Sequence, residues 1–265
     1  MRINVSDFDL AGTLECGQAF RWQRTPDGWF TGVVGRRTLR VRQIGDTFEG
    51  DVDPHYFALD VPLQKVIASF PDDGVLQEAV KKHRGLRVLR QEPWETLASF
   101  IARSTKQIVQ IRQIVAHLAE RFGENRAFPS VDVIARASLP ALATCKLGFR
   151  AEYLLKAARA IDAGEVRLDE LPAMEYERAL EELMKLDGVG EKIANCTLLF
   201  SCGHNAAFPI DVHVQRSLLR LFPNRKMTAQ EIRSYFGPYA GWAQQYLFFQ
   251  ERTRGRQALT DAVAK

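Results

Sequence analysis

The feature that most constrains the fold is a short glycine turn between two helical patterns, in the stretch LDGVGEKIANC (residues 186–196). Gly188 and Gly190 flank Val189, which predicts a tight turn joining two helices, a helix-hairpin-helix. The glycines let the backbone approach a ligand closely, and the N–H groups that begin the second helix can hold a DNA phosphate without reading sequence. A GxG turn alone is weak evidence. Two flanking helical patterns and a formal net charge of +4 favour this interpretation.

The pattern along the chain changes from strand-like to helical. The segments AFRWQR and WFTGVV flank the turn TPDG, and TLRVRQI alternates apolar with basic residues up to Gly45 and Asp46. From residue 53 onward the apolar residues recur at spacings of three and four, as in amphipathic helices. We therefore predict an α+β protein: an N-terminal antiparallel β-sheet domain over residues 1–85, an all-α helix-hairpin-helix domain over 86–253, and a C-terminal tail over 254–265.

The cysteines and the hydrophobic runs predict neither a metal site nor a membrane segment. Cys16, Cys145, Cys196 and Cys202 lack the close spacing of zinc or iron–sulfur ligands and suggest no disulfide framework. The N-terminus has no apolar stretch of signal-peptide length, and no run approaches a membrane span. We expect a soluble intracellular protein that has no membrane partner.

Lys192 falls in the first turn of the second hairpin helix, where the helix dipole disfavours a cation. The residues that follow it are apolar almost all round, so we expect this helix to be buried. Burial and the dipole together predict a lowered lysine pKa, and a neutral amine is a nucleophile that can attack a sugar carbon and form a Schiff base. The alternative is a surface lysine whose long stem carries its charge into water.

Asp211 stands in the stretch FPIDVHV, after a proline and directly before a helical pattern. This position predicts a helix N-cap. A capping carboxylate stays ionised, and its fixed negative charge can stabilise a developing oxocarbenium ion or relay a proton from an amine. Lysine in the hairpin and aspartate about twenty residues later form a plausible pair for cleaving a glycosidic bond.

These residues also carry a family resemblance. LDGVGEKIANC followed by FPIDVHV resembles the hairpin and aspartate of the helix-hairpin-helix DNA glycosylases, most closely the 8-oxoguanine DNA glycosylases. Five further stretches are similar to that family in the same order: CGQAFRW (16–22), YFALDVPL (56–63), GLRVLRQEPWE (85–95), LGFRAEY (147–153) and GPYAGWAQQYLF (237–248). The resemblance implies a base-excision-repair enzyme that flips 8-oxoguanine out of damaged double-stranded DNA and excises it through a lysine Schiff base. It also implies β-elimination at the abasic site.

The resemblance also has implications for cofactors, oligomeric state and location in the cell. Such an enzyme needs no metal and no organic cofactor, acts as a monomer, and resides in the cytoplasm at the nucleoid or in the nucleus. Lys192 would be the nucleophile and Asp211 its electrostatic partner.

The resemblance also implies four residues that bind the flipped base. Gly17 would offer its carbonyl to the proton that oxidised guanine carries on N7. Cys196 and Phe248 would sandwich the base, and Gln244 would address its Watson–Crick edge. Each has a simpler alternative: Gly17 in a turn, Cys196 and Phe248 in the core, and Gln244 on an exposed helix face.

Further residues are implied to contact DNA. Phe149 and Arg150 would probe the gap and the orphaned opposite base, and His213 with Gly188, Val189 and Gly190 would hold phosphates. Thr105, Lys106 and Gln110 stand where the family usually has asparagines and an arginine near the gap. This departure predicts a weaker demand for cytosine opposite the lesion.

Two other functions remain open from the sequence. One is a glycosylase for a different lesion, such as an alkylated purine, in which water attacks. The other is a non-enzymatic helix-hairpin-helix module that only binds DNA. Phosphate binding needs neither Lys192 nor Asp211, so their pairing argues against the second. Trapping a covalent complex on different lesions separates all three.

Overall fold

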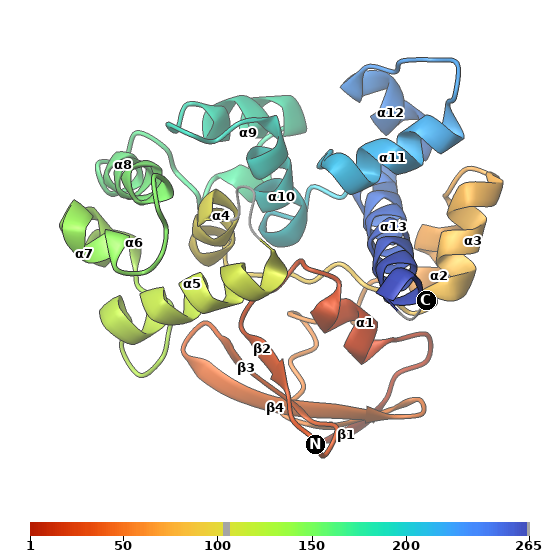
Figure 1. Cartoon of the computed structure of the whole chain (residues 1–265), viewed down its shortest axis with the longest axis horizontal. Helices are drawn as coiled ribbons and strands as arrows, with labels where there is room; N and C mark the ends of the chain where they lie inside the picture. The colour runs from red at the N-terminus through yellow and green to blue at the C-terminus, as the bar shows by residue number, and fades with distance from the viewer. Residues whose placement is uncertain (103–106, 264–265) are drawn as a thin grey trace.

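An antiparallel sheet forms one side of the molecule in the computed structural model, which describes residues 1–102 and 107–263 (Figure 1). Its five strands are β1 (Arg2–Asn4), β2 (Trp22–Arg24), β3 (Phe30–Val34), β4 (Arg37–Ile44) and β5 (Thr47–Gly50), in the order β1-β5-β4-β3-β2. The predicted TPDG turn joins β2 to β3, and the predicted turn at Gly45 and Asp46 joins β4 to β5. The sequence patterns therefore predicted the central part of the sheet correctly.

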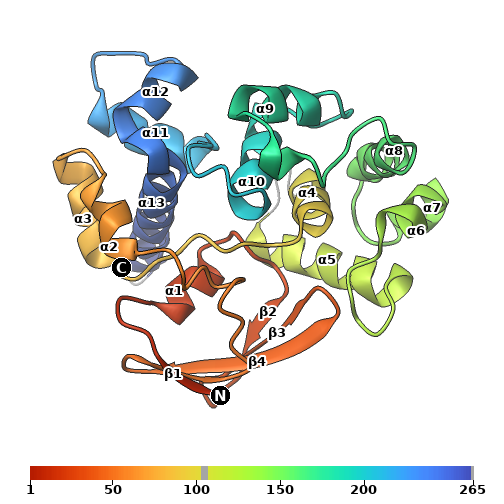
Figure 2. The same cartoon turned by 180° about the vertical axis from the view of Figure 1, so that it is seen from behind.

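A short helix, α1 (Leu10–Glu15), interrupts the region that the sequence pattern assigned to strands. Asp9 caps it, because its Oδ1 accepts the N–H of Gly12 at 2.9 Å. Leu10 and Leu14 are fully buried. Both Figure 1 and Figure 2 place α1 between the sheet and the C-terminal helix α13 (Ala240–Val263). The sequence therefore contained the cap signal, but the burial that stabilises so short a helix is tertiary.

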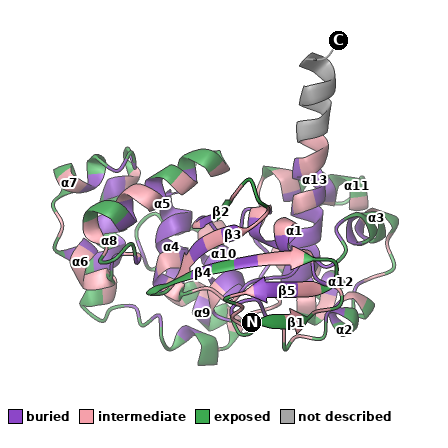
Figure 3. Ribbon diagram, turned by 90° about the horizontal axis from the view of Figure 1, so that it is seen from below, coloured by how far each residue is buried: buried purple, intermediate pink, exposed green. Residues whose placement is uncertain are grey.

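The rest of the chain is helical. Its α-helices before α13 are α2 (Leu63–Ala68), α3 (Gly74–Lys82), α4 (Pro93–Ala102), α5 (Ile108–Phe122), α6 (Val131–Ala135), α7 (Leu139–Ala143), α8 (Arg150–Asp162), α9 (Tyr176–Met184), α10 (Glu191–Ser201), α11 (Val212–Leu221) and α12 (Ala229–Phe236). Helices α4 and α10 pack against each other and are buried along most of their length (Figure 3). The predicted fold class, a β-sheet domain followed by a helix-hairpin-helix domain, is confirmed.

Two hydrophobic cores divide the molecule. Phe8, Trp22, Phe48, Tyr56 and Phe57 form most of the aromatic part of the core under the sheet. Helices α2 and α3 belong instead to the larger helical core, because α3 packs against α11 and α13. The predicted domain boundary at residue 85 stays a prediction, since elements before it contribute to both cores.

Helix α13 is longer than the sequence pattern predicts, because it continues through the segment we expected to be a tail. Arg254 pairs with Glu78 of α3 at 2.6 Å, and the hydroxyl of Thr253 donates to the carbonyl of Phe249 at 2.7 Å. The ion pair ties Arg254 to α3, whereas the hydroxyl contact lies within α13 itself. Among the described residues, no helix combines the length and the apolar character needed to cross a membrane.

Candidate active site

The predicted glycine turn joins α9 to α10. Gly188 has a φ of +77°, and a Cβ there would lie 2.5 Å from the ring of Tyr153 on α8. Any larger residue would therefore meet both backbone strain and a clash. Gly190 is the N-cap of α10 and supplies no side-chain cap. The first N–H groups of this helix consequently have no acceptor from the capping residue, which suits them to an external anion.

Lys192 is half-buried in the first turn of α10. Asp211 is the N-cap of α11, as predicted. Its Oδ1 accepts the N–H of His213 at 2.9 Å and that of Val214 at 3.0 Å. The beginning of α11 lies between α10 and α13 in both views of the fold (Figures 1 and 2). The hairpin lysine and the capping aspartate are thereby brought to the same place.

A small cavity, which we call the lysine cavity, joins the two residues. It is lined by Gly17, Lys192, Cys196, Phe200, Pro209, Asp211, Gln244, Gln245 and Phe248. All six residues assigned from the sequence to catalysis or to base binding are in this set. They come from four separate parts of the chain: the segment after α1, helix α10, the N-cap of α11 and helix α13.

The lysine cavity is very small. Its volume is about 10 Å³, which is roughly the space that one water molecule needs. A purine cannot enter without movement of the walls. Cys196 and Phe248 are both buried, and they line the cavity from different helices. Binding of a planar ring therefore requires that these two side chains separate.

Gln244 is buried rather than exposed, which excludes the simpler alternative for this residue. Within the part of the chain that the structure describes, its Oε1 is buried and has no hydrogen-bond partner. Buried amide oxygens are rarely left unpaired, because the loss of hydration is costly. An acceptor in the wall of a cavity is thus suited to a donor on a ligand.

Asn195 fixes the relative position of α10 and the segment before Asp211. Its Nδ2 donates to the carbonyl of Glu191 at 2.8 Å, while its Oδ1 accepts from the hydroxyl of Tyr176 at 2.8 Å and from the N–H of Phe208 at 3.0 Å. The sequence analysis assigned no role to Asn195. Its position one turn after Lys192 on a buried helix was the available signal.

His213 lies beside Phe248, with ring centroids 5.7 Å apart at an angle of 82°. Burial lowers the pKa of His213, and the nearby charge of Asp211 opposes this shift. Its Nδ1 is buried and makes no hydrogen bond to any described residue. The imidazole is therefore favoured in its neutral form.

Phe149 and Arg150 lie at the start of α8. Phe149 is 67% exposed, which is unusual for so large an apolar side chain. The guanidinium of Arg150 lies 4.8 Å from the Phe149 ring centroid and 5.3 Å from that of Tyr153. These cation–π contacts hold Arg150 between the exposed ring of Phe149 and the ring of Tyr153, which packs on Gly188.

Of the three residues that depart from the family pattern, Thr105 and Lys106 lie outside the described residues. Gln110 is described, and its Oε1 accepts the N–H of Gln107 at 3.0 Å in a capping box of α5. This amide oxygen is therefore occupied by the helix N-terminus.

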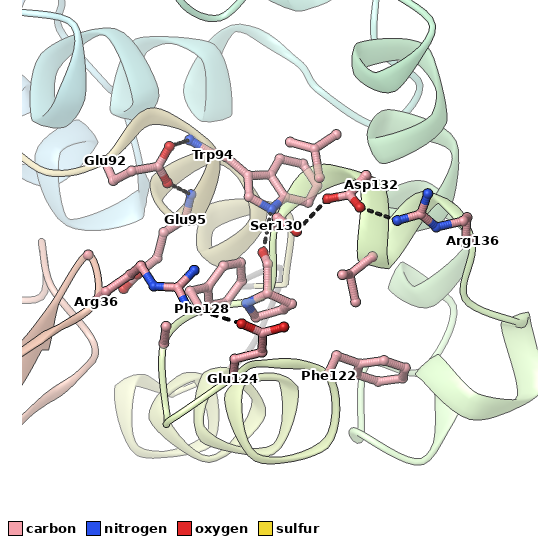
Figure 4. Close-up of a pocket in the computed structure, with 15 residues that line it drawn as sticks. Arg36, Glu92, Trp94, Glu95, Phe122, Glu124, Phe128, Ser130, Asp132 and Arg136 are labelled. Carbon is pink, nitrogen blue, oxygen red and sulfur yellow. Dashed lines mark hydrogen bonds and ion pairs between the residues drawn. The ribbon is translucent and has the colours of Figure 1, made fainter.

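A second cavity, of about 600 Å³, lies away from the lysine cavity beside α4 and α6 (Figure 4). Its charged side chains are engaged with neighbouring groups: Arg36 pairs with Glu124, Asp132 with Arg136, and Glu92 caps α4 by accepting the N–H of Trp94 and Glu95. None of the residues that the sequence assigned to a site lines it. We assign it no catalytic role.

Comparisons with known proteins match both parts of the chain. Residues 1–53 and 51–97 match the family model of the 8-oxoguanine DNA glycosylase N-terminal domain, and residues 98–238 match the HhH-GPD superfamily base excision DNA repair proteins. The chain is 30% identical to the N-glycosylase/DNA lyase OGG1 of Arabidopsis thaliana, over 95% of this chain and 79% of that protein. It is 29% identical to the N-glycosylase/DNA lyase of Saccharomyces cerevisiae, over 95% and 85%.

A solved structure is similarly close. The 8-oxoguanine glycosylase/lyase of Clostridium acetobutylicum, in complex with double-stranded DNA containing cytosine opposite 8-oxoguanine, has a TM-score of 0.90 to this chain. The two are 29% identical, and the match covers 96% of this chain and 98% of that one. The similarity therefore includes both the sheet and the helical part.

Proposed function

Because the chain belongs to the 8-oxoguanine DNA glycosylase family, within the HhH-GPD superfamily of base-excision repair proteins, we propose that it excises 8-oxoguanine from duplex DNA and then cleaves the strand at the abasic site. The protein is a bifunctional DNA glycosylase and lyase. The observation that carries the assignment to particular residues is the lysine cavity, which Lys192 and Asp211 line together with the four predicted base-binding residues.

Lys192 supplies the nucleophile. Its amine forms a bond to C1′ of the deoxyribose as the bond from C1′ to the base nitrogen breaks, and the departing base takes up a proton. Positive charge develops on the sugar in this step, and the fixed carboxylate of Asp211 stabilises it. The C1′–O4′ bond of the sugar ring then breaks and O4′ takes up a proton, which leaves a protonated imine between Lys192 and C1′. This imine acidifies the C2′ hydrogen, so that its removal expels the 3′ phosphate by β-elimination. One lysine therefore accounts for both activities.

The base binds between Cys196 and Phe248. Extruding it from the duplex costs a few kcal/mol, and the side chains must also separate because the cavity is too small for a purine. Gln244 then receives a donor on the Watson–Crick edge through its buried Oε1. The carbonyl of Gly17 accepts the N7 proton that 8-oxoguanine has and guanine lacks.

The duplex lies across the hairpin and the start of α8, where Phe149 and Arg150 stand. The uncapped start of α10, with Gly188, Val189 and Gly190, holds phosphates, and His213 contributes to the same surface. The exposed ring of Phe149 fills the gap left by the extruded base, and Arg150 addresses the orphaned one. We expect a monomer that acts in the compartment that holds the genomic DNA.

Borohydride trapping tests this assignment. Incubation with a duplex that contains 8-oxoguanine and with borohydride should yield a covalent complex, because the reagent reduces the imine. Lys192→Gln should abolish the complex. The matched control is Lys185→Gln in the same hairpin, since Lys185 is exposed and pairs with Glu182 at 2.5 Å; this variant should trap normally.

The result also separates the alternatives. If Lys192→Gln gives an undiminished yield of the covalent complex, Lys192 is not the nucleophile. Base release without any trapped complex, on 8-oxoguanine or on an alkylated purine, would indicate water as the nucleophile. Binding without base release would indicate a module that only binds DNA.

A further inference from the structure

Arg252 of α13 connects two parts of the lysine cavity wall that are far apart in the sequence. Its Nη1 donates to the carbonyl of Cys16 and its Nη2 to the carbonyl of Glu15, each at 2.6 Å, and the side chain is buried. These carbonyls end helix α1, where the backbone dipoles favour a cation. A planar guanidinium can hold two adjacent acceptors in one fixed geometry, which an ammonium cannot.

The same guanidinium also contacts the aromatic wall. It lies 5.8 Å from the ring centroid of Phe248 and 5.4 Å from that of Phe249. Residues 244, 248 and 252 follow one another at intervals of four on α13, so they lie along one face of the helix. Arg252 is therefore the next residue on the stripe that already carries Gln244 and Phe248.

Gly17 follows directly after the two clamped carbonyls and lies in a narrow slot. It has a φ of +99°, and a Cβ there would lie 2.7 Å from Cδ1 of Ile108, 2.9 Å from Nη1 of Arg252 and 3.6 Å from Cε1 of Phe248. Its backbone position relative to Phe248 is thus set in part by Arg252.

The neighbouring backbone is anchored by other side chains. Gln245 donates to Sγ of Cys16 at 3.0 Å, and Gln18 donates to the carbonyls of Thr13 and Arg87 at 3.0 and 2.7 Å. Gln18 holds the chain after Gly17 to Thr13 and Arg87, whereas Arg252 ties the chain before Gly17 to α13. Loss of Arg252 would release one of these two anchors.

We propose that Arg252 is a positioning residue for base discrimination: it holds Glu15 and Cys16 so that the Gly17 carbonyl meets the N7 proton of 8-oxoguanine in the lysine cavity. The proposal rests on the proposed function. A single misplaced hydrogen bond to the base corresponds to roughly a 10- to 100-fold loss. The chemistry at the sugar, which uses Lys192, does not require this carbonyl.

The test therefore compares two substrates. Arg252→Met keeps a long apolar stem and removes both donors. It should lower the single-turnover rate of 8-oxoguanine excision by about 10- to 100-fold. Strand cleavage at a preformed abasic site should stay within about threefold of the wild-type rate, because no base is present for Gly17 to contact. Arg252→Lys keeps the charge and should show a smaller loss of the same selective kind.

Arg254→Met is the matched control, because Arg254 lies on the same helix, pairs with Glu78 and lines no part of the lysine cavity. It should leave both rates unchanged. Equal losses on the two substrates in both Arg252 variants would show a general structural role and overturn the proposal, as would full excision activity in Arg252→Met. If the wild-type protein itself removes no 8-oxoguanine, the proposed function fails instead.

Discussion

Replacing Asn195 with alanine should damage both stability and chemistry, because this side chain joins α10 to the approach to Asp211. The substitution removes the acceptor of the Phe208 N–H and of the Tyr176 hydroxyl. Phe208 is buried, so its N–H cannot turn to water. The Glu191 carbonyl, in contrast, loses only a second hydrogen bond inside a helix.

The magnitude follows from these contacts. A buried donor without an acceptor costs about 1–3 kcal/mol, and the hydroxyl adds about 1 kcal/mol, for a total of about 2–4 kcal/mol. In a protein of this size each kcal/mol lowers Tm by about 2 °C, so we expect a loss of about 4–8 °C. Phe208 also precedes Asp211 closely. Displacing the carboxylate by about 1 Å relative to Lys192 should reduce the excision rate by about 10- to 100-fold.

Thermal unfolding and single-turnover excision measure the two effects. The control is Thr197→Val on the same helix, which removes a hydroxyl that donates to the Ile193 carbonyl and orphans no donor. It should cost less than about 1 kcal/mol. If Asn195→Ala unfolds within 2 °C of the wild type (roughly 1 kcal/mol) and excises at the normal rate, Asn195 does not position Asp211. Equal effects of the two substitutions would lead to the same conclusion.

Three further predictions follow from the site and its surroundings. Asp211→Asn should keep the wild-type Tm, because asparagine caps a helix nearly as well, but lower strand cleavage by about 100-fold or more; near-normal cleavage would make the carboxylate purely structural. Burial raises the pKa of Glu95 to about 7, against the opposing charge of Arg21, so the folded protein takes up a proton as the pH falls through 7 and gains stability. In denaturant titrations, the free energy of unfolding of Glu95→Gln relative to that of the wild type should therefore be more favourable at pH 8 than at pH 5.5. A difference that does not depend on pH would contradict the raised pKa. Since Gln110 caps α5 in place of reading a base, excision opposite cytosine should exceed that opposite other bases by only about 10- to 100-fold, and a preference above about 1,000-fold would refute this.

The parts of the site that the sequence predicted are those with local signals. The glycine spacing predicted the hairpin, and the proline and helical pattern around Asp211 predicted the N-cap, because turns and caps depend on a few adjacent residues. The family resemblance then assigned Gly17, Gln244 and Phe248, which the fold brings into one cavity.

The parts that the sequence did not predict depend on contacts between distant segments. Arg252 contacts carbonyls 236 and 237 residues away, and Asn195 bonds to two other segments. Helix α13 continues beyond Arg252, and Arg254 pairs there with Glu78 of α3. No local sequence pattern reports such an ion pair. Likewise, the small volume of the lysine cavity is a property of side-chain packing rather than of any motif.

The segment at Gly17 and helix α13 line the same cavity although they are far apart in the sequence. This arrangement has a consequence for synthesis on the ribosome. The strands, Gly17, the hairpin and Lys192 leave the ribosome before α13 does, so the nascent chain holds its nucleophile while the side chains that α13 contributes to the cavity are still missing. Pairing of such distant segments is slow compared with helix formation. Lesion recognition is therefore expected to be the last property that a newly made molecule acquires. A chain that stops after α12 would retain the hairpin and Lys192 but lack Gln244, Phe248 and Arg252.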